Sequence, residues 1–66
     1  MKTYLVAFSV VNRLGQFMSR AIVDHDGPIT RRTIENWETV KFREECVLTY
    51  GPTLSIRVTS FQALAQ

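Results

Sequence analysis

The chain has 66 residues, enough for a single domain over 1–66, and 45% hydrophobic residues with one Trp, two Tyr and four Phe exclude a disordered tract. Its only cysteine, Cys46, cannot form an internal disulfide, which excludes the disulfide-stapled class of secreted mini-protein and indicates a reducing compartment. Eight Lys and Arg residues against six Asp and Glu give a net charge of +2, which excludes an acidic mimic of nucleic acid and favours nucleic-acid binding only weakly.

A first strand is predicted over residues 2–12, where alternate positions are Tyr4, Val6, Phe8 and Val10 on one face and Leu5, Ala7, Ser9 and Val11 on the other. Both faces are largely apolar, which is typical of a central strand covered on two sides. One lysine precedes the apolar run, no small-residue cleavage site follows it, and a polar turn ends it. We therefore expect neither a signal peptide nor a membrane span, and a cytoplasmic protein.

A tight hairpin is predicted next, because Asn12-Arg13-Leu14-Gly15 has the composition of a turn and Gly15 can adopt positive φ. The second strand should cover residues 16–25. Its phase is ambiguous, because one side carries Phe17, Ala21 and Val23 and the other carries Met18, Arg20 and Ile22. A bulge that switches the register midway is one way to resolve this conflict.

A helix is predicted over residues 31–50, after the break at Asp26-Gly27-Pro28. Thr30 is the expected N-cap, and Ile29 and Ile34 have the spacing of a hydrophobic staple. The capping box should be incomplete, because Thr33 stands where Glu or Gln normally reaches back. Arg31 and Arg32 oppose the helix dipole in the first turn, so we consider them candidate binding residues.

The helix should end near Tyr50, because Gly51 can adopt a left-handed conformation and Pro52 prevents continuation. Helical spacing places one apolar stripe on it and leaves Phe42 and Cys46 off that stripe; its members are Ile34, Trp37, Val40, Val47 and Leu48. The segment 46–50 also has strand propensity. An alternative therefore ends the helix near Glu45 and adds a short strand there.

A third strand is predicted over residues 53–61, where Leu54, Ile56 and Val58 alternate with polar residues. The elements then define an α+β fold of the β-β-α-β type, with one helix on one face of a three-stranded sheet. The simplest right-handed arrangement has strand order 2-1-3, with the apolar first strand in the centre.

One face of this sheet should have no helix to cover it. If Tyr4 and its alternating neighbours face the helix, then Leu5, Ala7 and Val11 point to the other side. We expect Phe61 and part of the second strand to join them, together with Arg57. An uncovered apolar sheet face indicates an interaction surface, and a small domain gains much from added burial.

Catalytic and metal-binding chemistry is not indicated. Neighbouring residues on a strand point to opposite faces, so Asp24-His25-Asp26 cannot converge on one metal ion, and no second His or Cys completes a site. His25 and Cys46 lie before the helix and near its far end, about 25 Å apart at 1.5 Å per helical residue. We therefore expect a non-enzymatic protein without a cofactor.

Three short segments resemble a group of small phage and prophage proteins: Met1 to Ser9, Gly27-Pro28-Ile29-Thr30 ahead of a helix, and Thr59-Ser60-Phe61-Gln62. The chain departs from the group in lacking a Gly-rich second strand and in starting its helix with basic residues, so no functional residue is carried over. The resemblance implies an accessory protein of a mobile element, similar to anti-CRISPR proteins that act in the host cytoplasm by covering a host nuclease complex.

Three hypotheses for function follow. The leading one is an inhibitor that binds a host protein complex, such as a CRISPR–Cas effector, without catalysis. The second is a small nucleic-acid-binding protein that uses basic side chains including Arg31, Arg32 and Arg57. The third is a structural homodimer or a phage assembly factor joined through the open sheet face. None of the three involves a membrane.

Overall fold

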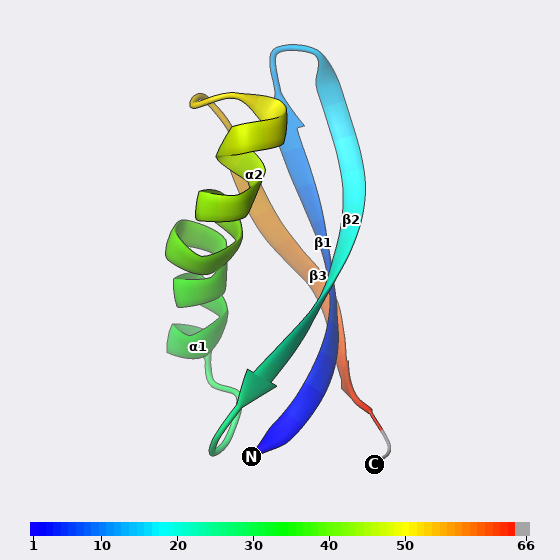
Figure 1. The fold of residues 1–66 in the computed structure, drawn as a ribbon, viewed down its shortest axis with the longest axis vertical. Coiled ribbons are helices and arrows are strands. Elements are labelled where there is room, and N and C mark those ends of the chain that lie inside the picture. The colour runs from blue at the N-terminus through cyan, green and yellow to red at the C-terminus, as the bar shows by residue number, and fades with distance from the viewer. Residues whose placement is uncertain (65–66) are drawn as a thin grey trace.

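The structure, a computed structural model, describes residues 1–64. Three strands form one antiparallel sheet in the order β2-β1-β3, with β1 at Lys2–Asn12, β2 at Gly15–His25 and β3 at Ser55–Ala63. A helix connects β2 to β3 and lies against one face of the sheet (Figure 1). The predicted α+β fold, with its strand order and single helix, is confirmed.

The β1–β2 hairpin keeps one register along its whole length. Asn12 pairs with Gly15 across a two-residue turn, and the pairing continues without a shift to Lys2 and His25. Leu14 N–H donates to Asn12 Oδ1 over 2.8 Å, and Gly15 has a φ of 140°. The bulge that we considered for the second strand is therefore not in its pairing with β1.

A bulge does occur in β3, which begins at Ser55 rather than at residue 53. Ala7 pairs with Ser60 but Phe8 pairs with Val58, so Val58 and Thr59 together oppose a single residue. The extra residue reverses the alternation beyond it. Phe61 lies opposite Val6 on the helix side, with its ring centroid 6.2 Å from that of Tyr4. The prediction that Phe61 joins the open face is wrong for this reason.

The helix begins at Arg31 with a complete capping box, which corrects the expectation of an incomplete one. Thr33 N–H donates to Thr30 Oγ1 over 3.3 Å, and Thr30 N–H donates to Thr33 Oγ1 over 3.2 Å. A threonine hydroxyl can accept this bond as a Glu or Gln oxygen would. The predicted staple residues Ile29 and Ile34 both pack against the core.

The helix has three parts, α1 (Arg31–Asn36), a π-helical turn η1 (Trp37–Lys41) and α2 (Phe42–Tyr50). Phe42 N–H donates to Trp37 O, five residues back, so the turn contains one extra residue and shifts the phase of α2. The predicted stripe is right at Ile34, Trp37 and Val47, which belong to the core or pack against it. It is wrong at Val40 and Leu48, which are 46% and 90% exposed, and in leaving out Phe42 and Cys46, which are buried.

Residues 46–50 are helical, so the alternative of a short strand there is wrong. Gly51 ends the helix with a φ of 90°, and its N–H donates to Val47 O over 3.0 Å. Positive φ is costly for residues with a Cβ, which explains glycine at this position. The helix thus has the bounds predicted from its cap signals.

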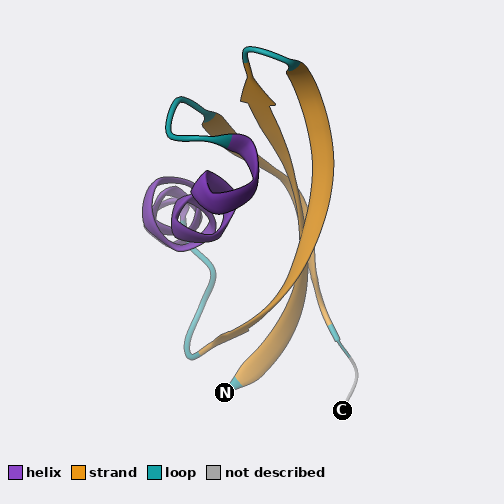
Figure 2. Cartoon of the chain, turned by 45° about the horizontal axis from the view of Figure 1, so that its top comes forward, coloured by secondary structure: helices purple, strands orange, loops and turns teal. Residues whose placement is uncertain are grey.

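The core lies between the helix and the sheet. Val6, Val10 and Phe42 are its largest fully buried side chains. Phe42 stacks on Phe8 with centroids 4.4 Å apart and planes 6° from parallel. Because these residues come from the central strand and the middle of the helix, they hold the helix on one face and leave the other free (Figure 2).

Candidate interaction surface

We call the side of the sheet away from the helix the open face. Even-numbered β1 residues from Tyr4 to Val10 are buried under the helix, so the odd-numbered ones face the other way. Directly opposed residues of neighbouring strands share a face. The open face therefore carries Thr3, Leu5, Ala7, Ser9, Val11, Gln16, Met18, Arg20, Ile22, Asp24, Ser55, Arg57, Ser60 and Gln62. In the part of the chain that the structure describes, no helix or strand covers them (Figure 2).

Apolar side chains of the open face gather on β1 and β2. Met18 and Ile22 are 65% and 68% exposed and Val11 is 44% exposed. Ile22 lies directly opposite Leu5, which is half-buried. The β3 part of the same face is polar, with serines at 55 and 60, Arg57 and Gln62. We call the β1–β2 part of the face, in which Ser9, Gln16, Arg20 and Asp24 lie among the apolar side chains, the apolar half, and the β3 part the polar half.

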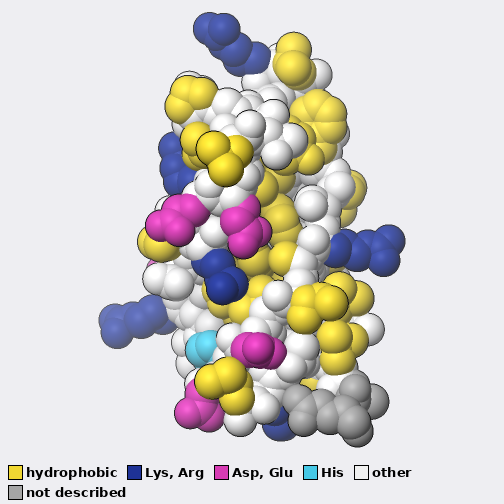
Figure 3. All heavy atoms as spheres, viewed as in Figure 1, with side chains coloured by type: hydrophobic (Ala, Val, Ile, Leu, Met, Phe, Trp, Pro, Cys, Tyr) yellow, Lys and Arg dark blue, Asp and Glu magenta, His cyan; other side chains and the backbone are white. Residues whose placement is uncertain are grey.

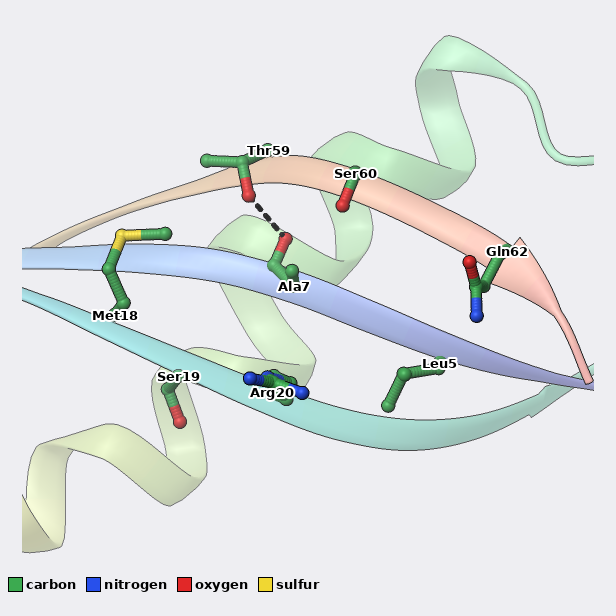
Figure 4. A pocket seen from close by; sticks show the side chains of 8 residues that line it. All are labelled: Leu5, Ala7, Met18, Ser19, Arg20, Thr59, Ser60 and Gln62. Carbon is green, nitrogen blue, oxygen red and sulfur yellow. Dashed lines mark hydrogen bonds between the residues drawn. The ribbon is translucent and has the colours of Figure 1, made fainter.

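A shallow hollow lies at the centre of the open face, where small side chains leave space between larger ones (Figure 4). Ala7 and Ser60, a directly opposed pair, line its floor. Thr59 Oγ1 donates to Ala7 O over 3.1 Å beside it, at the bulge. The other lining residues are Leu5, Met18, Ser19, Arg20 and Gln62.

The predicted interaction residues fall into two groups. Leu5, Ala7, Val11 and Arg57 share the open face, with Arg57 opposite Ser9. Phe61 lies on the helix side, 6.4 Å from Trp37 between ring centroids. Arg31 and Arg32 are exposed in the first turn of α1, an element that covers the opposite face of the sheet. The structure thus brings four of the seven residues together.

Part of the second strand was expected on the open face, and its residues there include Met18, Arg20 and Ile22, which the sequence pattern did not single out. Their placement depends on the phase of β2, which was ambiguous by composition alone. The two-residue turn between Asn12 and Gly15 contains the missing information, because turn length sets which residues of a hairpin are opposed.

Cys46, Asp24 and His25 are the titratable side chains of residues 1–64 whose surroundings bear on reactive or metal chemistry. Cys46 is a buried free thiol, and desolvation, followed by the charge of Glu45, raises its pKa above 9.0. A raised pKa reduces the thiolate that nucleophilic or metal chemistry requires. Thr3 Oγ1 donates to Asp24 Oδ1 over 2.6 Å, and His25 Nε2 lies 3.3 Å from Pro28 O. Among residues 1–64, no three His, Cys, Asp or Glu side chains are placed to hold a metal ion.

Comparisons with protein families, with curated proteins and with solved structures give no match to this chain. The resemblance to small phage proteins therefore stays a prediction. Within the described residues, no helix combines the length and the apolar character needed to cross a membrane.

Proposed function

We propose that this chain is a non-catalytic module that binds another protein through its open face. The observation that carries the proposal is the uncovered apolar half of that face, in which Met18, Ile22 and Val11 are exposed beside Leu5 and Ala7. Exposed apolar side chains grouped on one face together with polar and charged groups are typical of protein interfaces. Ser60 and Gln62 supply hydrogen-bonding groups at the rim, and Arg20 and Arg57 supply charge.

The distribution of aromatic residues favours a protein over single-stranded nucleic acid as the partner. All seven aromatic side chains belong to the helix or to the helix side of the sheet, Phe17 because it lies opposite Val10 and beside Tyr50, and Phe61 because of the bulge. Sheets that bind single strands stack bases on exposed aromatic rings. Lys and Arg side chains are also dispersed on the face that Figure 3 shows, rather than gathered in a basic patch.

In its narrower form, the proposal is that the partner is a host protein complex, such as a CRISPR–Cas effector, which the chain inhibits by covering a surface. This form is supported by the resemblance to phage proteins and by the small size of the domain. Inhibition by coverage requires complementary area and a few anchors, with no cofactor.

Capture of interacting proteins by variants tests the broad form. Ser60→Arg fills the hollow and Val11→Asp places a charge in the apolar half, whereas Leu48→Asp adds the same charge on the exposed side of the helix. We expect a protein that is retained by the unmodified chain and by Leu48→Asp to be lost with both open-face variants. Equal retention by all four chains would show that the open face is not the contact.

Titration of a purified CRISPR–Cas effector tests the narrower form separately. An inhibitor that covers the effector should abolish target cleavage at a molar ratio near one, and Ser60→Arg should weaken that inhibition. Full cleavage at a large excess of the chain would rule out this effector as the partner while leaving the broad form standing.

A further inference from the structure

The outer edge of β2 has free backbone groups along most of its length. Leu64 N–H donates to Thr3 O over 2.8 Å, so the carbonyl of this odd-numbered β1 residue points toward β3. Backbone groups alternate sides in an antiparallel ladder, so even-numbered β1 residues bond to β2. The β2 residues opposite the odd-numbered ones must direct their N–H and C=O groups away from the sheet. These residues are Gln16, Met18, Arg20, Ile22 and Asp24.

Within residues 15–25, most of the usual protections of an edge strand are not found, and the charged side chains Arg20 and Asp24 have opposite signs. β2 has 11 residues with neither proline nor lysine, and its pairing with β1 contains no bulge. An edge of this kind is a template for pairing with another strand. Its exposed side chains include Met18 and Ile22, so pairing would also bury apolar area on the open face.

We propose that β2 pairs antiparallel with β2 of a second copy, about a two-fold axis at Ile22. In this register Ile22 lies opposite Ile22 of the second copy. Arg20 lies opposite Asp24 of the second copy, and the symmetry repeats this pair. On the helix side, Ala21 lies opposite Val23. Ser19 lies opposite His25 at each end of the overlap, and every other opposed pair joins apolar with apolar or positive with negative side chains.

Charge selects this register over the one with the longest overlap. A two-fold axis at Arg20 would pair all 11 residues of β2 but would place the two Arg20 side chains directly opposite each other. Like charges in opposed positions destabilise a sheet, and opposite charges stabilise it. Asp24 can take part because Thr3 occupies only its Oδ1, which leaves Oδ2 for the arginine.

The result is one six-stranded sheet whose two open faces are continuous. The hollow has Ala7 and Ser60 at its floor and is bordered on β2 by Met18, Ser19 and Arg20, so the joined edges run along one side of it. This inference goes beyond the proposed function, because it concerns the β2 edge and a second copy of the chain rather than a foreign partner.

Sedimentation of the purified chain tests the pairing directly. We expect the mass to rise with concentration from the monomer value of 7.6 kDa to twice that value. The amide protons of Arg20, Ile22 and Asp24 should exchange more slowly as the dimer forms, because these are the groups that become paired. A chain that stays monomeric at concentrations up to about 1 mM would overturn the proposal. At that concentration, only associations weaker than roughly 4 kcal/mol escape detection.

Charge reversal tests the register. Arg20→Asp alone and Asp24→Arg alone each place like charges opposite one another twice, so each should weaken self-association about tenfold or more. An equal mixture of the two variants should restore association, because the mixed pair again joins Asp with Arg at both positions. Arg57→Asp, on β3, should leave it unchanged.

Two outcomes would contradict the register. One is a mixture that stays as weakly associated as its components, with both variants folded by circular dichroism. The other is a dimer that tolerates both reversals but is lost with Val11→Asp, which would assign self-association to the open face instead of the β2 edge.

Discussion

On the helix side of the sheet, Val6, Val10 and Phe42 are fully buried, and aromatic rings stack on one another across the layers. On the open side of the same strands, Met18 and Ile22 are mostly exposed, and among residues 1–64 Ser9 is the one buried polar residue. Alternation along each strand separates these two sets by a single residue. The difference teaches that stability and recognition can be assigned to opposite faces, so that substitutions on one face should leave the other intact.

The largest expected effect is on the helix side. Phe42→Ala removes a ring that stacks on Phe8 and contacts Trp37, and should cost about 3–5 kcal/mol of unfolding free energy. Leu48→Ala, on the exposed side of the same helix, should change it by less than about 0.5 kcal/mol. Urea denaturation measures both.

Because Phe42→Ala can unfold so small a domain, Phe42→Leu provides an intermediate point. It should lose less than Phe42→Ala and still show a cooperative transition. Equal stability of Phe42→Leu and the unmodified chain would contradict the central role of the ring.

The next largest loss of stability is expected at the outer edge of β3. Side chains of the helix form hydrogen bonds to the backbone there, whereas the outer edge of β2 has no such partners within the described residues. Glu38 accepts a hydrogen bond from Val58 N–H over 2.7 Å, and Arg43 donates to Leu54 O and Pro52 O, both over 3.1 Å. Glu38→Ala should cost about 1.5–3 kcal/mol, because a part-buried N–H loses a charged acceptor. Glu35→Ala, at an exposed position of α1, is the matched control.

Hydrogen exchange gives the Glu38 substitution a local readout. The Val58 amide should exchange faster in Glu38→Ala than in Glu35→Ala, because only the former removes its acceptor. If both variants protect this amide equally, Glu38 is not what caps the edge.

The elements of the fold could be predicted from the sequence because each depends on local chemistry. Alternation defines β1, and Thr30 and Gly51 define the helix ends. What could not be predicted is which face of the helix or strand is buried after an inserted residue, because the insertion shifts the pattern of buried positions. The π-turn after Trp37 moves Phe42 into the core, and the bulge at Thr59 moves Phe61 to the helix side. Each insertion is stabilised by tertiary contacts, which local patterns do not contain.

The open-face residues could be predicted from the sequence in β1 and in the part of β3 that precedes the bulge, because alternation is regular there. Leu5, Ala7 and Val11 follow β1 without irregularity, and Arg57 precedes the bulge. Which β2 residues lie on the open face could not be predicted from the sequence, because Met18 and Ile22 are as apolar as the β2 residues on the buried side. Hydrophobicity alone cannot separate the faces of a strand that is apolar on both.

A smaller effect is expected at the helix cap. Thr30→Ala removes the acceptor of the Thr33 N–H and should cost about 1 kcal/mol. Thr30→Ser retains the hydroxyl and should stay close to the unmodified chain. The difference in urea midpoint between the two variants isolates the cap. If Thr30→Ser is as unstable as Thr30→Ala, the Thr30 methyl rather than the hydroxyl is what matters.

The neutral thiol of Cys46 should contribute less to the unfolding free energy than the Thr30 cap does, and alkaline pH should reveal this contribution. Its pKa is raised in the folded state, so above about pH 9 the unfolded chain loses its thiol proton first. Stability from the neutral thiol is therefore complete below that pH and declines as pH rises toward the folded pKa. Cys46→Ala lacks this decline, so the gap in unfolding free energy between the two chains should narrow from pH 8 to pH 10. A constant gap would show that burial does not disfavour the thiolate.

Substitutions on the open face should change the unfolding free energy least. They therefore give the clearest test of whether residues that bind a partner differ from residues that stabilise the fold. Met18→Ser and Ile22→Ser should each alter the unfolding free energy by less than about 0.5 kcal/mol, because their side chains are 65% and 68% exposed. The same substitutions remove apolar contact area that a partner would bury, so binding should weaken while the urea midpoint stays constant. If the urea midpoint falls as steeply as binding does, these residues stabilise the fold itself. The assignment of stability to one face and recognition to the other would then be wrong.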